Sequence, residues 1–402
     1  MPAIYLSSCA VAPQYEGVDL GIGDATLIKA LAEATGRTEV AVKAAYTAEG
    51  DLGVVAMQSR ATQRTMFTPA PLTVRGVFAT LRDIAKTEGA KSVEKKRSLI
   101  KKLLVASREV EAGYIIRLLQ GKLRVGLAQQ TVTTALAHAA VLHECSAAAA
   151  GGDARKLLSG TPLADRLGEA EAVLKQVYSE CPTWDRIIPA LLSGGVVALP
   201  KTCHFVPGVP VKPMLAKATH GVAEIVERFA DVEFTCEYKY DGERAQVHVL
   251  DNGEVRVFSR NLEDNTQKYP DIVSTFKAHL KPGVRSVVLD AEAVAYDRET
   301  HKILPFQVLS TRAKKGGAVE DVKIQVCLFA FDCLFADGRT LLREPLLERR
   351  RLLYSCLNET EGHLQFAKER TRCARAARAG ASGAGAVTWR ACICRTAATW
   401  TS

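Results

Sequence analysis

The sequence has no apolar run approaching the roughly 20 residues that a helix needs to cross a bilayer. Its first thirteen residues, Met1–Pro13, have neither a basic start nor a sustained apolar stretch, which argues against a secretory signal. The eleven cysteines form no CxxC pair, a usage that favours reduced thiols over a disulfide framework or a metal site. These absences predict a soluble intracellular protein without a membrane partner.

The last 32 residues, 371–402, contain no lysine, aspartate or glutamate. They do contain five arginines, so the formal net charge of +9 falls to +4 without them. A surplus of that size is weak evidence for a polyanionic partner, and the clustering of charge matters more. The stretch is rich in Ala, Arg and Gly and has no clear helical or strand period. We expect an irregular tail that does not belong to the fold.

Residues 1–200 have apolar side chains at three- and four-residue spacing, which predicts a helical domain. Ser92 is placed to cap one helix, and Gly121 is placed to end another. The prolines at 200, 207, 210 and 213 then predict a linker over 201–213. The clearest helical segments are Ala25–Thr35, Val93–Ser107, Gly113–Leu119 and Gly168–Cys181.

After the linker the apolar residues alternate with polar ones. Phe234, Cys236 and Tyr238 follow this period, and a hairpin is indicated where two alternating runs flank the turn residues 251–253. Further strands are expected at Ser286–Ala295 and Gln325–Phe331. The region 214–370 is therefore predicted to be an α+β domain dominated by antiparallel strands.

The densest group of reactive side chains is the sequence EYKYDGER at 237–244. A lysine at a strand end, followed by Asp-Gly, can project its amine into a cleft. There, burial and neighbouring cations can lower a lysine's pKa and free the amine for nucleophilic attack. Gly242 allows close approach of the backbone, and the guanidinium fork of Arg244 suits a phosphate. For a bare K-x-D-G pattern, a solvated hairpin with interspersed charges is the alternative.

The longer context favours the reactive site. The stretch resembles the signature of the nucleotidyltransferase superfamily, which includes ATP-dependent DNA ligases, RNA ligases and messenger RNA capping enzymes. It is followed in order by VFSRN at 257–261, DNTQKYP at 264–270, LDAEAV at 289–294 and LFAFD at 328–332. The resemblance is greatest to the replicative eukaryotic branch of the ATP-dependent DNA ligases and covers residues 12–368.

The resemblance implies a role for each motif residue. Lys239 would attack the α-phosphate of ATP, release pyrophosphate and hold AMP through a phosphoramidate. Glu237 would accept from the exocyclic amine of adenine, and Phe331 would stack on the base. For Phe331, an ordinary place in a strand core remains the alternative.

Two arginines and a second glutamate complete the implied nucleotide site. Arg244 and Arg260 would contact the nucleotide and the phosphate being transferred. Glu292 would bind a ribose hydroxyl or help to position a metal ion. For Glu292, a surface ion pair remains the alternative.

The helical half has two basic features. Six cations and one acid lie within 91–102, although such a run is usually only a solvated helix face. A glycine-bounded turn at 121–126 exposes backbone N–H groups suited to phosphate. In the family that the sequence resembles, this region grips duplex DNA across the minor groove without reading sequence. The residues expected to contact DNA are Lys95, Lys96, Lys101, Lys122 and Arg124.

Together these features predict a multi-domain fold. An all-α DNA-binding domain at 1–200 and the linker at 201–213 precede an α+β, antiparallel, ATP-grasp-like nucleotidyltransferase adenylation domain at 214–370. The resemblance implies an ATP-dependent DNA ligase that seals 5′-phosphate/3′-hydroxyl nicks through a lysyl-AMP intermediate, with ATP and Mg²⁺ as cofactors. It further implies nicked duplex DNA as partner, a monomer, a nuclear location, and work in replication, repair and recombination.

The family pattern stops near Lys368, so the adenylation domain is expected to be truncated and the chain to be a poor ligase. A further glutamate motif, a K-x-K segment and an oligonucleotide-binding barrel are not recognisable in 371–402. Two alternatives stay open. One is another nucleotidyltransferase, such as an RNA ligase or capping enzyme. The other is a catalytically impaired ligase that only binds nicked or duplex DNA.

Overall fold

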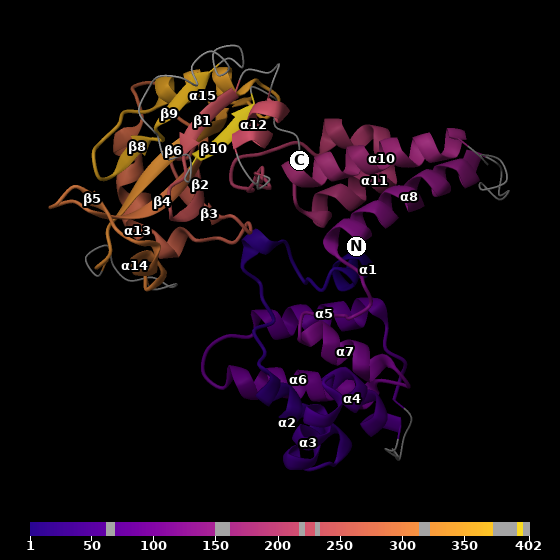
Figure 1. The fold of residues 1–402 in the computed structure, drawn as a ribbon. Helices are drawn as coiled ribbons and strands as arrows, with labels where there is room; N and C mark the ends of the chain where they lie inside the picture. The colour runs from indigo at the N-terminus through magenta and orange to yellow at the C-terminus, as the bar shows by residue number, and fades with distance from the viewer. Residues whose placement is uncertain are drawn as a thin grey trace. The chain divides into compact units, whose positions relative to one another are not determined.

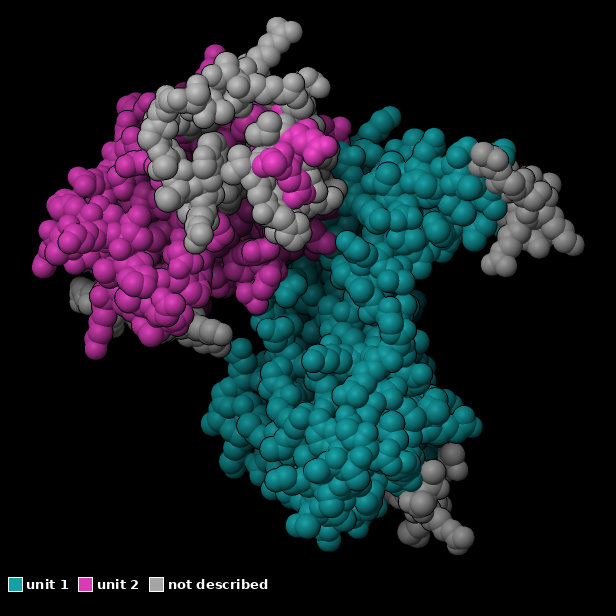
Figure 2. Space-filling view, in the orientation of Figure 1, with its two compact units in different colours: residues 1–178, 183–203 teal, residues 179–182, 204–402 magenta. Residues whose placement is uncertain are grey.

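The computed structural model describes residues 1–61, 69–148, 161–216, 222–229, 234–312, 322–372 and 392–396. The chain divides into two compact units, residues 1–178 with 183–203 and residues 179–182 with 204–402, which Figure 2 colours separately. In the part of the chain that the structure describes, no helix is both long and apolar enough to span a membrane.

The first unit is helical, as predicted (Figure 1). Its core is built from apolar side chains such as Leu31, Leu52, Ile84 and Ile100, all of which are fully buried. The four segments predicted from periodicity correspond to α2, α6, α7 and α10. The described helices are α1 (Pro2–Ser7), α2 (Asp24–Thr35), α3 (Glu39–Glu49), α4 (Leu52–Ala61), α5 (Val74–Lys86), α6 (Ser92–Ala106), α7 (Glu111–Leu119), α8 (Gln129–Ala148), α10 (Thr161–Glu180) and α11 (Trp184–Thr202).

Two predicted helix ends have different outcomes. Gly121 follows α7 with φ +73°, the left-handed conformation that commonly ends a helix, so this prediction is confirmed. The prediction of Ser92 as an N-cap is wrong, because α6 begins at Ser92 and its cap residue is Lys91, with φ +63°. Gly89 also has a positive φ, so the turn that precedes α6 ends at Lys91 and Ser92 is already helical.

The described residues of the second unit form two sheets (Figure 1). The larger sheet has the order β3-β2-β4-β6-β7, with β5 paired to β4 and β8 paired to β6, and the smaller sheet has the order β10-β1-β9. The strands are β1 (Phe234–Tyr238), β2 (Glu243–Val249), β3 (Val255–Ser259), β4 (Val287–Asp297), β5 (Lys302–Ile303), β6 (Val326–Ala336), β7 (Arg339–Thr340), β8 (Leu364–Phe366), β9 (Glu369–Arg372) and β10 (Cys392–Thr396). The helices that accompany them are α12 (Val222–Arg228), α13 (Pro270–Thr275), α14 (Phe306–Ser310) and α15 (Leu346–Cys356), with 3₁₀ turns η2 (Thr266–Lys268) and η3 (Phe276–His279).

The predicted hairpin is confirmed as β2–β3, in which Val247 lies opposite Val257 and Val249 lies opposite Val255. The prediction of a domain dominated by antiparallel strands is confirmed, and one of the described pairs is parallel. Strand β8 pairs parallel to β6, so the larger sheet is mixed. The parallel pair is possible because α15 lies between the two strands in sequence and provides the crossover that parallel strands require.

The prediction that 371–402 is irregular is wrong for residues 371–372, which end β9, and for Cys392–Thr396. The latter segment forms β10 and pairs antiparallel with β1, from Tyr238 opposite Cys392 to Phe234 opposite Thr396. A strand edge offers a row of backbone N–H and C=O groups to any extended segment, and residues 392–396 include β-branched Ile393 and Thr396. The other tail residues beyond Arg372 lie outside the described part of the chain.

The predicted linker over 201–213 packs against the larger sheet for most of its length. Phe205 and Val211 are buried in a small apolar cluster with residues of β4 and β6. The side-chain amide of Gln246 exchanges two hydrogen bonds with the backbone of Val211, at 2.8 and 3.1 Å. The backbone N–H of Gly208 donates to His248 Nδ1 at 2.9 Å. Residues 204–213 are therefore a packed part of the second unit.

Candidate functional site

Lys239 is the first residue after β1, and its side chain is exposed to solvent. Three residues later, at Gly242, the backbone passes very close to β4. A Cβ on Gly242 would lie 2.3 Å from the carbonyl oxygen of Ala293, which no side chain tolerates. Gly242 is therefore required for the approach of the Lys239 loop to β4.

Arg244 lies on β2 and is largely buried against the neighbouring strands. Its Nε donates to Asp290 Oδ1 at 2.8 Å, a second guanidinium nitrogen bonds Asp290 Oδ2, and a third donates to the Met214 carbonyl at 3.2 Å. The guanidinium carbon lies 5.3 Å from the ring centroid of Phe331. Three of the five N–H groups of Arg244 are used by these contacts, so the expected hydrogen bonds to a phosphate would come from the remaining N–H groups.

Glu292 lies on β4 directly opposite Arg244 of β2. Burial raises the pKa of its carboxyl to about 7, against the opposing influence of Arg244 and Lys239 and a hydrogen bond from the backbone of Gly242. Glu292 is therefore half-buried within reach of the charge of Lys239, an arrangement different from a surface ion pair. Near neutral pH it can either donate or accept a hydrogen bond, which suits a ribose hydroxyl.

Glu237 and Phe331 are both buried in the second unit. Glu237 is on β1, is only 2% exposed, and forms an ion pair with Arg350 of α15. Phe331 is on β6, and its ring faces the guanidinium of Arg244. Burial of Phe331 agrees with a strand-core role, and its place beside Arg244 is compatible with the expected stacking role. The structure brings Lys239, Arg244, Glu292 and Phe331 into one connected group.

Arg260 is not part of that group. It lies one residue beyond β3, is exposed, and makes no hydrogen bond or ion pair within the described residues. Its contact with a nucleotide stays a prediction.

Sequence reasoning missed two residues of the site, Asp290 and Arg350. Asp290 lies two positions before Glu292 on one strand, and this period of two was a signal that both carboxylates share a face. For Arg350 there was no such signal, because its partner Glu237 is 113 residues away in sequence.

The basic residues of the first unit differ in their surroundings. Lys95 and Lys101 on α6 and Lys122 in the turn after α7 are exposed. Lys96 donates to the Leu20 carbonyl at 3.1 Å. Arg124 is exposed but lies 3.7 Å from a carboxylate oxygen of Asp51.

The same Asp51 carboxylate binds Arg117 at 2.8 Å. Burial opposes the ionised form of Asp51, but the hydrogen bonds from Arg117 and from the backbone of Gly53 outweigh it and lower the pKa of this carboxyl. The carboxylate therefore neutralises part of the positive charge at the turn.

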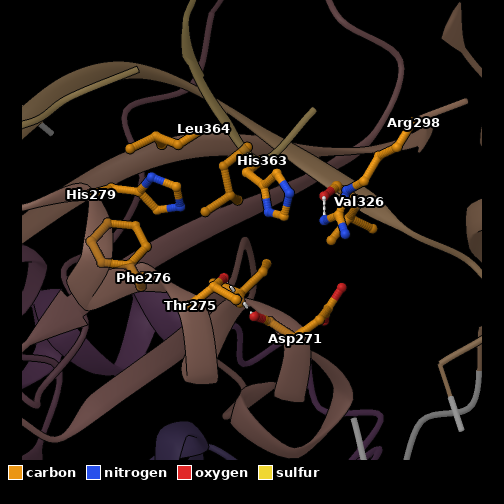
Figure 3. A pocket seen from close by; sticks show the side chains of 10 residues that line it. Asp271, Thr275, Phe276, His279, Arg298, Val326, His363 and Leu364 are labelled. Carbon is orange, nitrogen blue, oxygen red and sulfur yellow. Dashed lines mark hydrogen bonds between the residues drawn. The ribbon is translucent and has the colours of Figure 1, made fainter. Parts of the chain in front are cut away.

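A small pocket lies elsewhere in the second unit, between the α13–η3 segment and strands β6 and β8 (Figure 3). Figure 3 shows the imidazoles of His279 and His363 side by side, with Arg298 beyond His363, and the two ring centroids are 6.1 Å apart. Burial lowers the pKa of both histidines. None of the predicted site residues lines this pocket.

The chain matches two family models and many curated proteins. Residues 1–137 match the DNA ligase N terminus and residues 213–378 match the ATP dependent DNA ligase domain. DNA ligase 1 of Arabidopsis thaliana is 52% identical over 364 residues, which are 90% of this chain and 45% of the relative. DNA ligase 1 of Drosophila melanogaster is 46% identical over 91% of this chain and 48% of the relative, and that of Saccharomyces cerevisiae is 42% identical over 92% and 48%.

The chain spans about half the length of the curated relatives that it matches. The matched regions include both the helical unit and the sheets that hold Lys239. The chain therefore belongs to the family of ATP-dependent DNA ligases.

Proposed function

We propose that this chain performs the adenylation chemistry of an ATP-dependent DNA ligase, with Lys239 as the nucleophile. The observation that supports this proposal most is the position of Lys239. Its side chain is exposed directly after β1, and its charge acts on Glu292, which lies opposite Arg244. The chain also matches the ATP dependent DNA ligase domain. Transfer of the AMP to the 5′-phosphate of a nick, and its displacement by the 3′-hydroxyl, would complete sealing.

The first transfer forms a bond between Lys239 Nζ and the α-phosphorus of ATP. The bond from that phosphorus to the bridging oxygen breaks, and pyrophosphate leaves with the electron pair. An amine attacks only in its unprotonated form, so Lys239 must first give a proton to water or to Glu292. The pKa of about 7 at Glu292 lets that carboxyl exchange a proton at neutral pH.

The residues present fit a magnesium ion only together with the nucleotide. Among the described residues, no three His, Cys, Asp or Glu side chains gather closely enough to hold a metal. Magnesium is usually bound through one or two carboxylates plus substrate phosphates, and Glu292 offers one such carboxylate. When bound, the ion would neutralise phosphate charge. Asp290 is less suited because both of its oxygens bind Arg244.

The first unit is proposed to bind duplex DNA by phosphate contacts. The exposed amines of Lys95, Lys101 and Lys122 support this role, together with the match of residues 1–137 to the DNA ligase N terminus. Ammonium groups on flexible stems contact phosphate as point charges and carry no base preference. Lys96 and Arg124 already have partners in this unit and are expected to contribute less.

The adenylation proposal is tested with ATP labelled at the α-phosphate. The unaltered chain should acquire label that survives denaturation and alkali but is released by acid, as a phosphoramidate is, and Lys239→Ala should acquire none. Lys239→Arg should also fail, because a guanidinium is essentially never deprotonated in proteins. Lys302→Ala is a useful control because Lys302 of β5 is exposed and lies outside the proposed group. Label retained by Lys239→Ala would overturn the proposal.

A further inference from the structure

Arg350 is a buried arginine that contacts two of the residues proposed to bind the nucleotide. It lies on α15, is only 3% exposed, and forms ion pairs with Glu237 of β1 and Glu369 of β9. Its Nε also donates to the backbone carbonyl of Phe331 on β6, at 3.3 Å. One guanidinium therefore binds both residues that are proposed to recognise adenine, the edge acceptor Glu237 and the stacking ring of Phe331.

The pairing of β1 with β9 explains why a cation is needed there. Glu237 lies directly opposite Glu369 in the antiparallel register. Like charges at facing positions of a strand pair destabilise it, and water cannot relieve Glu237 because its side chain is buried. The neighbouring Arg349 cannot substitute, because its guanidinium binds both oxygens of Asp332 at 2.8 and 3.0 Å.

We propose that Arg350 is a positioning residue that fixes the carboxylate of Glu237 and thereby sets the preference for a 6-aminopurine nucleotide. This inference rests on the proposed adenylation function. A carboxylate held by a guanidinium only accepts hydrogen bonds, and its two oxygens offer about four acceptor sites, so an ion pair does not saturate it. It accepts from the 6-amino group of adenine and repels the 6-oxygen of guanine.

Without Arg350, the Glu237 carboxylate would face Glu369 with no cation between them. It would turn away from Glu369 or take up a proton, and either change removes an acceptor of fixed direction. The loss would therefore fall on recognition of the 6-amino group, and the triphosphate contacts of the nucleotide would be spared. This selectivity separates positioning from a purely structural role.

The test measures nucleotide binding by calorimetry in a Lys239→Ala background, so that no chemistry intervenes. Two probes are compared, ATP and the triphosphate of unsubstituted purine riboside, which lacks the 6-amino group. The parent should prefer ATP, and Arg350→Gln should lose roughly tenfold or more of that preference, the size expected for a hydrogen bond to a charged group. Affinity for the purine triphosphate should change little.

Two arginines on the same helix are matched controls. Arg349→Gln removes an equally buried arginine and should weaken both nucleotides alike, whereas Arg351→Gln alters a side chain that is 76% exposed and should weaken neither. In a Glu237→Gln background, Arg350→Gln should cause no further change in preference. An equal loss for both nucleotides, or additive effects with Glu237→Gln, overturns the inference. If Arg350→Gln does not fold, Arg350→Lys is measured in its place. The ratio of its affinities for ATP and for the purine riboside triphosphate then decides.

The proposed function is judged separately, by the labelling of Lys239. If the unaltered chain takes no label while the Arg350-dependent preference persists, the adenylation proposal fails and the positioning role stands. If label is taken but the preference does not depend on Arg350, the positioning role fails alone. A Lys239→Ala chain that binds neither nucleotide overturns the positioning role.

Discussion

Charged side chains are held in opposite ways in the two units. Around the proposed nucleotide site, Asp290 and Arg350 are buried, Arg244 is largely buried, and each binds at least one oppositely charged partner. In the first unit, Lys95, Lys101 and Lys122 project into solvent. Removing the partner of a buried charge is strongly destabilising, whereas an exposed charge interacts only weakly with its neighbours. Substitutions in the first group should therefore change folding and recognition, and substitutions in the second should change only affinity and its salt dependence.

The largest effect is expected from Asp290→Ala. Removing this carboxylate leaves the buried guanidinium of Arg244 without its two-pronged partner. Breaking a buried pair on one side typically costs about 3–5 kcal/mol of unfolding free energy. Denaturant unfolding of the second unit measures it. The matched exposed pair is Arg256 with Glu254, where Glu254→Ala should cost under about 1 kcal/mol. Equal costs for the two substitutions would abolish the contrast between buried and exposed charges.

An intermediate effect is expected at Glu292 and depends on pH. The raised pKa of about 7, against 4.5 for the free side chain, means that the folded state binds more protons between these values. Stability from this group is therefore present at pH 4.5 and is lost as pH rises through 7. Glu292→Gln should remove that loss and stabilise the protein by about 1–2 kcal/mol more at pH 8 than at pH 5, after discounting for partial exposure. Thermal melts of Glu292→Gln and of the unaltered chain at the two pH values measure this difference. An equal stabilisation at both pH values would contradict the raised pKa of Glu292.

The smallest effect per residue is expected in the first unit. Lys122→Ala should weaken binding to duplex DNA several-fold on every sequence, and it should lower the log–log salt slope by roughly 0.9. Arg124→Ala should do less, because Asp51 already neutralises part of that charge. Fluorescence anisotropy across a salt series measures both. A loss restricted to one DNA sequence, or a larger effect at Arg124, would show that exposure does not govern these contacts.

The sequence predicted the parts of the fold that depend on local periodicity. The β2–β3 hairpin was predictable because alternation and a turn signal occur within fifteen residues. Strand β6 was predicted to end at Phe331 but extends to Ala336. An aspartate is rarely found inside a buried strand, and Asp332 is tolerated there because Arg349 of α15 binds its carboxylate.

The candidate site was predictable to a similar depth. The K-x-D-G pattern placed Lys239 at a strand end, because strand and turn are both encoded within a few residues. The partners of Arg244 and Glu237 lie 46 and 113 residues away, so no local pattern could indicate them. The same reason explains Arg124, whose expected phosphate contact competes with a carboxylate from a distant helix boundary.

The adjacent arginines of α15 constrain how this part of the gene can change. Arg349 and Arg350 reach Asp332 and Phe331, which are also adjacent, on β6. A helix advances about 1.5 Å per residue and turns about 100°, whereas a strand advances about 3.3 Å and alternates faces. Inserting or deleting one residue in the first turn of α15 would turn both guanidinium groups away from their targets at once. We expect this stretch to accept point substitutions at Arg351 but no change in length.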